Sequence, residues 1–220
     1  MPYPKVMERL LQELQKLPGV GPRTAERLAH YLLRDGADSA GPLARALDEA
    51  ADKVRPCEQC FNLSVEACCP ICQDESRDQG RLLVVEGARE LEAMESAGWK
   101  GLYHVLPGSL TRPDLPRRGS PTRNNLEALA RRLESGSVRE VVLGTNPDLD
   151  GDGTAMVVSE FLATVAPRGV EVSRLARGVP TGASIEYTNP AVLAEAIQER
   201  RAQVPSPVQG GAARTEGAGG

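Results

Sequence analysis

Hydrophobic positions divide the chain into an all-helical beginning, a polar middle segment and an α/β remainder. Apolar residues recur at helical spacing over residues 5–17, with charged residues between them: Val6, Met7, Leu10, Leu11, Leu14 and Leu17. A Pro-Gly turn follows, and a second helical pattern covers residues 24–33. A third covers residues 42–54, where Pro42 suits the first turn of a helix. The pattern therefore predicts three helices before the polar middle segment.

From residue 81 the pattern changes to short apolar runs alternating with helical ones. Residues 82–85 are wholly apolar, as expected of a strand that is buried on both faces. Strands are expected at residues 82–85, 102–106, 138–143 and 170–175, and helices at residues 90–96, 124–133 and 154–165. Such alternation predicts a parallel α/β sheet. A further helix is expected at residues 190–202, followed by a Gly/Ala/Pro-rich tail from Pro205 that we expect to be disordered.

Composition fits a globular protein with an aliphatic core. The hydrophobic fraction is 40% over 220 residues, but aromatic residues make up only 3%. The chain start lacks the apolar run of a signal peptide, and no later stretch reaches the roughly 18 apolar residues of a membrane span. We therefore expect a cytoplasmic protein without a membrane partner.

The net charge of −4 is unusual for a protein that binds nucleic acid, because affinity for DNA comes mostly from neutralising phosphates. Either DNA is not the partner, or basic residues are concentrated locally. The segment 106–132 favours local concentration, since it holds Arg112, Arg117, Arg118, Arg123, Arg131 and Arg132 against only Asp114 and Glu127. A solvated basic loop explains the same residues.

The turn between the first two expected helices carries the sequence Pro-Gly-Val-Gly-Pro. Gly19 and Gly21 allow a tight turn and the close approach of a partner. Free N–H groups at the start of the next helix can then bind an anion, and Arg23 and Arg27 lie on one face of that helix. A plain corner between two helices is the alternative. Since non-specific DNA binding is typically about 10⁻⁴ to 10⁻⁶ M, one such hairpin is weak, and several in an oligomer would gain avidity.

Four of the five cysteines form two Cys-x-x-Cys pairs. Cys57 with Cys60 and Cys69 with Cys72 offer the thiolates of a tetrahedral zinc site without an open position, so the ion is expected to be structural. A redox pair and iron–sulfur ligation are the alternatives. Cys68 is the spare thiol. Because structural zinc contributes about 10–16 kcal/mol in small finger peptides, we expect this polar loop to be disordered without its metal.

Acidic residues follow two of the expected strands. Glu86 follows the strand at 82–85, and Asp148, Asp150 and Asp152 follow the strand at 138–143. The carboxyl ends of parallel strands share one sheet edge, so these carboxylates can converge on Mg²⁺. An acidic surface that docks a basic protein partner is an equal alternative. A calcium loop of the EF-hand type is disfavoured, because Ser159 occupies its twelfth position and a strand-like segment precedes it.

The modules and their order resemble the RecR family of bacterial recombination mediators over nearly all of residues 5–200. The hairpin is similar to that of helix-hairpin-helix proteins, and the Glu with the Asp-x-Asp is similar to the Toprim fold. Thr145-Asn146-Pro147, residues 175–182 and residues 185–187 add to the resemblance. It implies a helix-hairpin-helix module at 1–55, a four-cysteine zinc finger at 56–79, a Toprim domain at 80–176, a Gly/Pro-rich connection with a C-terminal helix at 177–203, and a tail at 204–220.

The resemblance implies a clamp without enzymatic activity. Such a clamp is a ring of four subunits that binds single- and double-stranded DNA without sequence specificity and loads recombinase with RecO and RecF. Gly19, Gly21, Arg23 and Arg27 would face DNA, and Glu86 with the segment 148–152 would lie where RecO is expected. Relatives usually carry Glu-Gly-Glu where this chain has Asp150-Gly151-Asp152, which is closer to a Toprim catalytic pair.

Two other functional classes explain parts of the sequence. A metal-dependent Toprim nuclease, or another Toprim enzyme, would use Glu86, Asp150 and Asp152. A strand-passing enzyme also needs a nucleophilic tyrosine, and none of the tyrosines stands in a persuasive setting: Tyr3, Tyr31, Tyr103 and Tyr187. A purely structural zinc adaptor would not need the hairpin. The C-terminal helix carries an apolar stripe, Val192, Leu193, Ala196 and Ile197, which packs either on its own sheet or on a neighbouring subunit.

Overall fold

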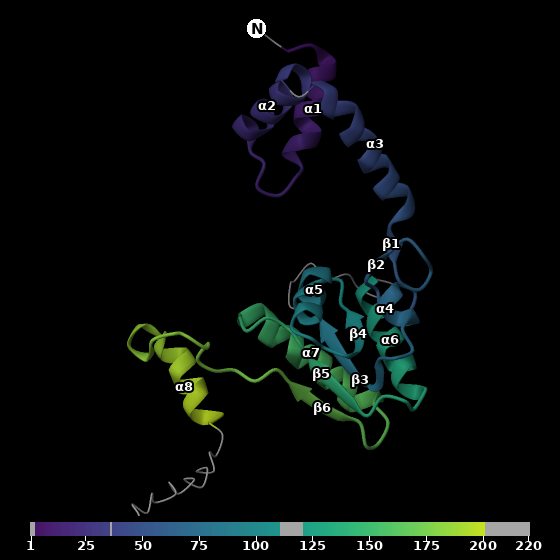
Figure 1. Cartoon of the computed structure of the whole chain (residues 1–220), viewed down its shortest axis with the longest axis vertical. Helices are drawn as coiled ribbons and strands as arrows, with labels where there is room; N and C mark the ends of the chain where they lie inside the picture. The colour runs from purple at the N-terminus through teal and green to yellow at the C-terminus, as the bar shows by residue number, and fades with distance from the viewer. Residues whose placement is uncertain (1–2, 36, 111–120, 201–220) are drawn as a thin grey trace, which may run out of the picture.

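The N-terminal module of the computed structural model is a helical hairpin followed by a long helix (Figure 1). The structure describes residues 3–35, 37–110 and 121–200. Its first elements are α1 (Lys5–Gln15), α2 (Pro22–His30), the π-helical turn η1 (Tyr31–Asp35) and α3 (Ala37–Lys53). The hairpin closes on a small core of Met7, Leu11, Ala25 and Ala29. Two alanines let α1 and α2 approach closely, because they add little side-chain bulk between the helices.

The long helix α3 corrects the prediction made for Pro42. It begins at Ala37, so Pro42 lies inside the helix and not in its first turn. Proline in a helix interior removes one backbone hydrogen bond. The polar module that follows contains a short antiparallel pair, β1 (Arg55–Pro56) with β2 (Leu63–Ser64), and one helical turn, α4 (Pro70–Gln73).

The remainder is a parallel sheet with strand order β4-β3-β5-β6. Its elements are β3 (Asp78–Val85), α5 (Ala88–Ser96), β4 (Gly101–Val105), α6 (Pro121–Glu134), β5 (Glu140–Leu143), α7 (Leu149–Val165) and β6 (Glu171–Arg174). β3 lies between β4 and β5, so the strand order reverses beside β3. Ligands of open α/β sheets bind outside the carboxyl ends of the strands at such a reversal.

The strand β3 is buried on both faces, as its unbroken apolar run predicts. Leu82 and Val84 join the core that α6 and α7 cover, through Leu129 and Val158 among others. The alternate residues of β3, including Leu83, belong to a second core on the opposite face. On that face α5 is joined by two residues of the cysteine-containing module, Phe61 and Ile71.

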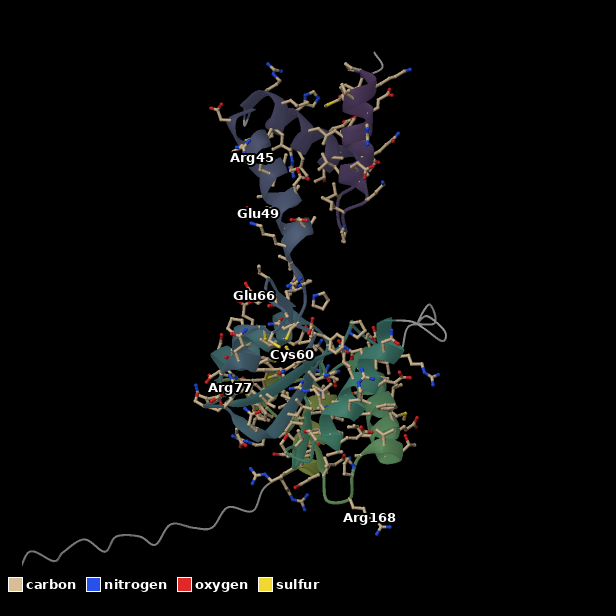
Figure 2. All side chains as sticks on the ribbon, turned by 90° about the vertical axis from the view of Figure 1, so that its right-hand side faces the viewer. Arg45, Glu49, Cys60, Glu66, Arg77 and Arg168 are labelled. Carbon is tan, nitrogen blue, oxygen red and sulfur yellow. The ribbon has the colours of Figure 1, made fainter. Side chains whose placement is uncertain are left out.

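The cysteine-containing module also covers the outer edge of the sheet. The N–H of Val105 in β4 donates to the carbonyl of Cys60 at 2.7 Å. An uncovered edge strand offers free backbone groups to other chains. The module is therefore part of the α/β body (Figure 2, where Cys60 is labelled within it).

Beyond β6 the chain forms a connecting segment, the 3₁₀ turn η2 (Ile185–Tyr187) and α8 (Pro190–Gln198). None of the α8 side chains belongs to the two cores of the sheet in the described part of the chain. Val192 and Leu193 are half-buried and Ile197 is 64% exposed. The sequence left open whether the apolar stripe of α8 packs on its own sheet or on a neighbouring subunit. In the described structure the stripe does not pack on the core of its own sheet. No helix among the described residues is long and apolar enough to span a membrane.

Most predicted elements are confirmed, with shifted ends. All four predicted strands and the seven predicted helices are present. The largest errors are at the starts of α3 and α7, which begin at Ala37 and Leu149 and not at residues 42 and 154. The short elements β1, β2, α4, η1 and η2 were not predicted. Arg112, Arg117, Arg118 and Asp114 of the basic segment, the tail from Pro205 and the expected end of the last helix at residue 202 lie outside the described residues.

Candidate nucleic-acid interface and metal centre

The glycine-rich turn between α1 and α2 is open to a partner. Gly19 has a φ of +78°, which a residue with a side chain rarely adopts. A Cβ added at Gly19 or Gly21 would meet no atom within 4 Å. The turn therefore presents bare backbone on the surface. At Gly19 the glycine is required by conformation, whereas at Gly21 it leaves space.

The first turn of α2 has backbone donors without partners. Gly21 is the N-cap and has no side chain to cap the helix, and Pro22 has no N–H. The N–H of Ala25 donates to the carbonyl of Gly21 at 2.9 Å. The amides of Arg23 and Thr24 remain, and the described part of the chain supplies no acceptor for them. Since a helix N-terminus carries partial positive charge, these two amides suit an anion such as a phosphate.

The structure brings Arg23 and Arg27 to the same surface. Both side chains are exposed on α2, and neither forms an ion pair with a carboxylate of the described residues. Their spacing of one helical turn places both on one face. Two guanidinium groups without a carboxylate partner and two free amides on one surface have the chemistry to bind anions.

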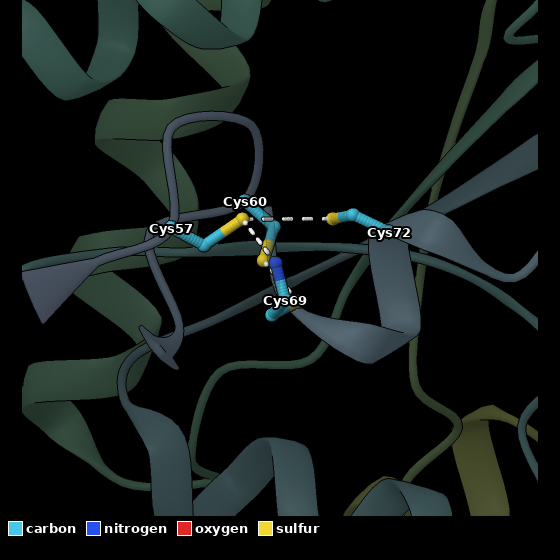
Figure 3. A group of neighbouring side chains, drawn as sticks. All are labelled: Cys57, Cys60, Cys69 and Cys72. Carbon is cyan, nitrogen blue, oxygen red and sulfur yellow. Dashed lines mark hydrogen bonds between the residues drawn. The ribbon is translucent and has the colours of Figure 1, made fainter. Parts of the chain in front are cut away.

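The four paired cysteines converge on one point (Figure 3). Their sulfur atoms all lie within 4.8 Å of one another. The Sγ atoms of Cys57 and Cys72 are 3.9 Å apart, and those of Cys60 and Cys69 are 3.5 Å apart. Four sulfurs at about 2.3 Å from one zinc ion in tetrahedral geometry lie about 3.8 Å apart. The donor set and its spacing therefore fit one zinc ion with no open position.

Ionisation of the four thiols also requires a cation at the cluster. A hydrogen bond with Cys72 lowers the pKa of Cys60 to about 5, whereas burial raises the pKa of Cys69 to about 11. Hydrogen bonding with Cys60 raises the pKa of Cys72. Buried thiols that lie this close together cannot all ionise without a neighbouring cation. A divalent metal supplies that charge, and the N–H of Cys69, 3.3 Å from Sγ of Cys57, orients one ligand.

Glu86 lies at the carboxyl end of β3, at the reversal of strand order. It is 8% exposed, and its Oε2 accepts hydrogen bonds from the backbone N–H of Asn146 at 3.1 Å and from the side-chain amide of Asn146 at 2.7 Å. Its Oε1 is buried without a hydrogen-bond partner among the described residues. The structure thus confirms that the segments after β3 and β5 meet at one edge.

The acidic segment is the start of a helix. Asp148 is the N-cap of α7, and its Oδ1 accepts from the N–H of Gly151 at 2.7 Å. Asp150 and Asp152 lie in the first turn, where carboxylates stabilise the helix dipole. The helical backbone also removes the calcium-loop alternative, because an EF-hand ligates through a loop over these positions.

Asp152 is engaged by two arginines from the end of β6 and beyond it. Arg174 donates to its Oδ1 at 2.5 Å, and Arg177 donates to the same atom. These hydrogen bonds hold the pKa of Asp152 below its usual value. Arg177 also donates to Glu195 of α8 at 2.8 Å, so it ties α8 to the start of α7. Sequence spacing could not reveal this, because the partners are far apart along the chain.

Glu86, Asp150 and Asp152 are not gathered as a metal site. Among the described residues, the cysteines are the one group of three or more His, Cys, Asp and Glu side chains whose ligand atoms lie close enough to hold an ion together. The acidic edge is instead a negative surface whose members have separate roles. Asn146 binds Glu86 at this edge, and Arg174 and Arg177 bind Asp152. Asn146 and Arg177 lie in segments that carry the family resemblance, whereas Arg174 does not.

Comparison with known protein families accounts for the three modules in order. Residues 7–51 match the helix-hairpin-helix model of RecR, residues 54–74 match the RecR model of a zinc finger with four cysteines, and residues 80–176 match the Toprim domain model. The zinc finger match includes all four converging cysteines. The cluster is therefore a four-cysteine zinc site, in agreement with its geometry.

Curated relatives align over almost their whole length. Recombination protein RecR of Desulforudis audaxviator is 43% identical over 203 residues, which cover 91% of this chain and 99% of the relative. That of Thermus thermophilus is 45% identical with the same coverage of both chains. That of Pelotomaculum thermopropionicum is 44% identical over 201 residues, which cover 90% of this chain and 97% of the relative.

Proposed function

The chain belongs to the RecR family of recombination proteins, and on that premise we propose that it is a DNA-binding clamp without enzymatic activity. It binds single- and double-stranded DNA without sequence specificity and acts with RecO and RecF in the cytoplasm to load recombinase. The observation that carries the proposal is the turn before α2. There Gly19 and Gly21 expose backbone, two amides lack acceptors, and Arg23 and Arg27 are unpaired in the described chain.

A contact of this kind is independent of base sequence. Phosphate oxygens are the same at every nucleotide, and contacts to them position a protein without carrying sequence information. The hairpin offers only two arginines, so each subunit contributes few phosphate contacts and binds weakly at physiological salt. Several subunits on one DNA molecule would raise the affinity through effective concentration. The proposal therefore includes a homo-oligomer, a ring of four.

Exposed apolar side chains support assembly at both ends of the chain. On the helical module Val6 is 80% exposed and Leu47 is 62% exposed. Near α8, Ile185 is 69% exposed and Tyr187 is 85% exposed. Apolar groups left in water at two separate surfaces are what a closed ring, which needs two interfaces in each subunit, would cover.

The acidic edge is the surface proposed for RecO. Asp148 and Asp150 are exposed there on either side of Leu149, whose side chain is 88% exposed, and Glu86 is buried at the end of β3. Negative charge around one protruding apolar side chain suits a basic protein partner, because charge steers the encounter and the apolar group is buried on contact. The pairing of Asp152 with Arg174 and Arg177 supports a protein-docking role over metal binding at that carboxylate.

Charge reversal at the hairpin tests the proposal. We expect Arg27→Glu to weaken binding to labelled single- and double-stranded DNA to a similar degree for every sequence and to reduce the dependence of binding on salt. Arg168→Glu is the matched control, because it makes the same change of charge on an exposed side chain at the end of the α/β body away from α1–α3 (Figure 2). Fluorescence anisotropy over a range of salt concentrations measures both.

Equal loss in the two variants would mean that overall charge, and not the hairpin, governs binding. Unchanged binding in Arg27→Glu combined with Arg23→Glu would refute the hairpin as the contact surface. The zinc site has no part in this contact. Its proposed role is structural.

One observation favours a second candidate, a Toprim nuclease that uses Glu86, Asp150 and Asp152 with Mg²⁺. The buried Oε1 of Glu86 lacks a hydrogen-bond partner in the described chain, and a Mg²⁺ ion at the sheet edge would coordinate that oxygen. Incubation of both kinds of DNA with the protein and Mg²⁺ or Mn²⁺ separates the candidates. Cleavage that needs metal and disappears in Asp150→Asn would establish the nuclease. Intact DNA under the same conditions is the result expected of the clamp.

A further inference from the structure

Arg132, in the last turn of α6, is a half-buried cation without a carboxylate partner in the described chain. It forms no ion pair in the described part of the chain, and its Nη1 donates to the backbone carbonyl of Tyr103. Burial lowers the pKa of Arg132, and the sulfurs of the four zinc ligands oppose that effect. A guanidinium partly removed from water without an anion nearby is destabilising. The fold must therefore supply negative charge close to this side chain.

The position of Arg132 is fixed at the contact between the sheet and the zinc module. The outer edge of β4 is covered by side chains and by one zinc knuckle. The carbonyl of Gly101 accepts from Arg77 at 3.1 Å, that of Tyr103 accepts from Arg132, and that of Val105 accepts from Asn125 at 2.9 Å. The N–H of Val105 donates to the carbonyl of Cys60 itself. Arg132 thus shares one strand edge with a zinc ligand.

A cavity of about 400 Å³ joins Arg132 to the other end of the same knuckle. Its lining includes Glu58 and Gln59, the two residues between Cys57 and Cys60, together with Arg131 and Arg132 of α6. Glu58 lines the same cavity and is exposed, but it forms no ion pair with Arg132. The guanidinium is therefore held between a strand edge and the segment that carries two of the four thiolates.

The chemistry of the zinc site matches this placement. Four thiolates around one Zn²⁺ leave two net negative charges, and Cys57, Cys60 and Cys69 are at most 1% exposed. Hydration cannot offset that charge inside the protein, so a fixed cation beside the sulfurs stabilises the ionised, metal-loaded cluster. Groups beyond the direct ligands commonly tune metal affinity in this way.

We propose that Arg132 is the counter-ion of the zinc tetrathiolate and that it couples the metal site to the Toprim sheet. It is a positioning residue, since it touches neither DNA nor the metal. Its charge lowers the free energy of the loaded cluster, and its hydrogen bond to Tyr103 keeps that charge beside the knuckle. Metal retention is thereby linked to the packing of α6 against β4.

Zinc affinity of the full-length protein tests this role. Competition with a chromophoric chelator should show that Arg132→Gln binds zinc about 10- to 100-fold more weakly than the wild type, the usual cost of losing a group beyond the direct ligands. Arg132→Lys keeps the charge and should restore most of the affinity. In protein loaded with Co²⁺, the thiolate-to-metal charge-transfer band of Arg132→Gln should move to lower energy, because the sulfur electrons lose a stabilising charge.

Two matched variants serve as controls. Arg131→Gln removes the same charge from the exposed neighbour and should leave affinity and spectrum unchanged. Glu58→Gln should also leave them unchanged, and if it weakened zinc binding as Arg132→Gln does, Glu58 would be the partner and the proposal would be wrong. Wild-type affinity in Arg132→Gln would overturn it as well. Should Arg132→Gln not fold, Arg132→Lys decides: a large loss of zinc despite the retained charge contradicts the counter-ion role.

Discussion

Single residues set the geometry of both candidate sites. Some of these residues could be predicted from the sequence, and others could not. The cysteines could be predicted because two-residue spacing within each pair is itself the geometry that a metal requires. Gly19 could be predicted because a tight turn needs a left-handed backbone there. The partners of Asp152 could not, since Arg174 and Arg177 reach it only after β6 is in place beside β5. The same limit hid the position of Arg132 at the edge of β4 beside the zinc module.

Gly151 packs against the backbone of Asn146, which leaves no room for a side chain at this position. A Cβ at this position would lie 2.0 Å from the carbonyl oxygen of Asn146, a backbone atom that cannot move freely. We expect Gly151→Ala to lower the free energy of unfolding by about 1–3 kcal/mol, as overpacking does. Gly178→Ala is the control, because its Cβ would meet no atom within 4 Å. Urea unfolding of both variants measures the difference, and equal stability would contradict the packing described for the start of α7.

At the scale of elements, the alternation of apolar runs predicted the α/β sheet, but local chemistry set the ends. The start of α7 was placed five residues late, because Asp148 and its capping bond to Gly151 begin the helix inside an acidic stretch that lacks apolar periodicity. The start of α3 was also placed five residues late, at Pro42, because a proline is expected in the first turn of a helix. The helix in fact accommodates Pro42 in its interior, which a periodic pattern of apolar residues does not reveal. The strands β1 and β2 are too short to leave a pattern.

The order of the zinc module is expected to depend on its metal. It joins the cores of the sheet through few side chains, Phe61 and Ile71 among them. Structural zinc contributes about 10–16 kcal/mol in isolated fingers, comparable to the roughly 5–15 kcal/mol that stabilises a whole domain. We expect Cys57→Ser to lose zinc, to lower the melting temperature and to expose the edge of β4, which promotes aggregation.

Cys68→Ser is the matched control, because Cys68 lies outside the cluster and its replacement removes no ligand. Thermal melts, zinc content and light scattering on heating distinguish the two variants. A Cys57→Ser protein that melts with the wild type while free of zinc would contradict the structural role. The spacing of the cysteines predicted the ligands, but only the structure shows that the loop they fold closes a sheet edge.

At the scale of the whole molecule, three modules in series place the hairpin proposed to bind DNA at one end and the acidic edge on the α/β body (Figure 1). The order of modules could be predicted from the sequence. Their packing could not, because the contacts between the zinc module and the sheet involve single backbone groups such as the N–H of Val105. The exposed apolar side chains at the two ends became evident only once the cores were complete, and they support assembly into a ring.

If weak hairpins hold DNA because several subunits act together, the protein that binds DNA must be an oligomer. Light scattering after size-exclusion chromatography gives the solution mass, alone and with DNA, at concentrations where DNA is bound. We expect a species of four times the 23.5 kDa chain mass, bound to DNA as one unit. A protein that binds DNA with undiminished affinity while it remains a monomer at every concentration would contradict this expectation.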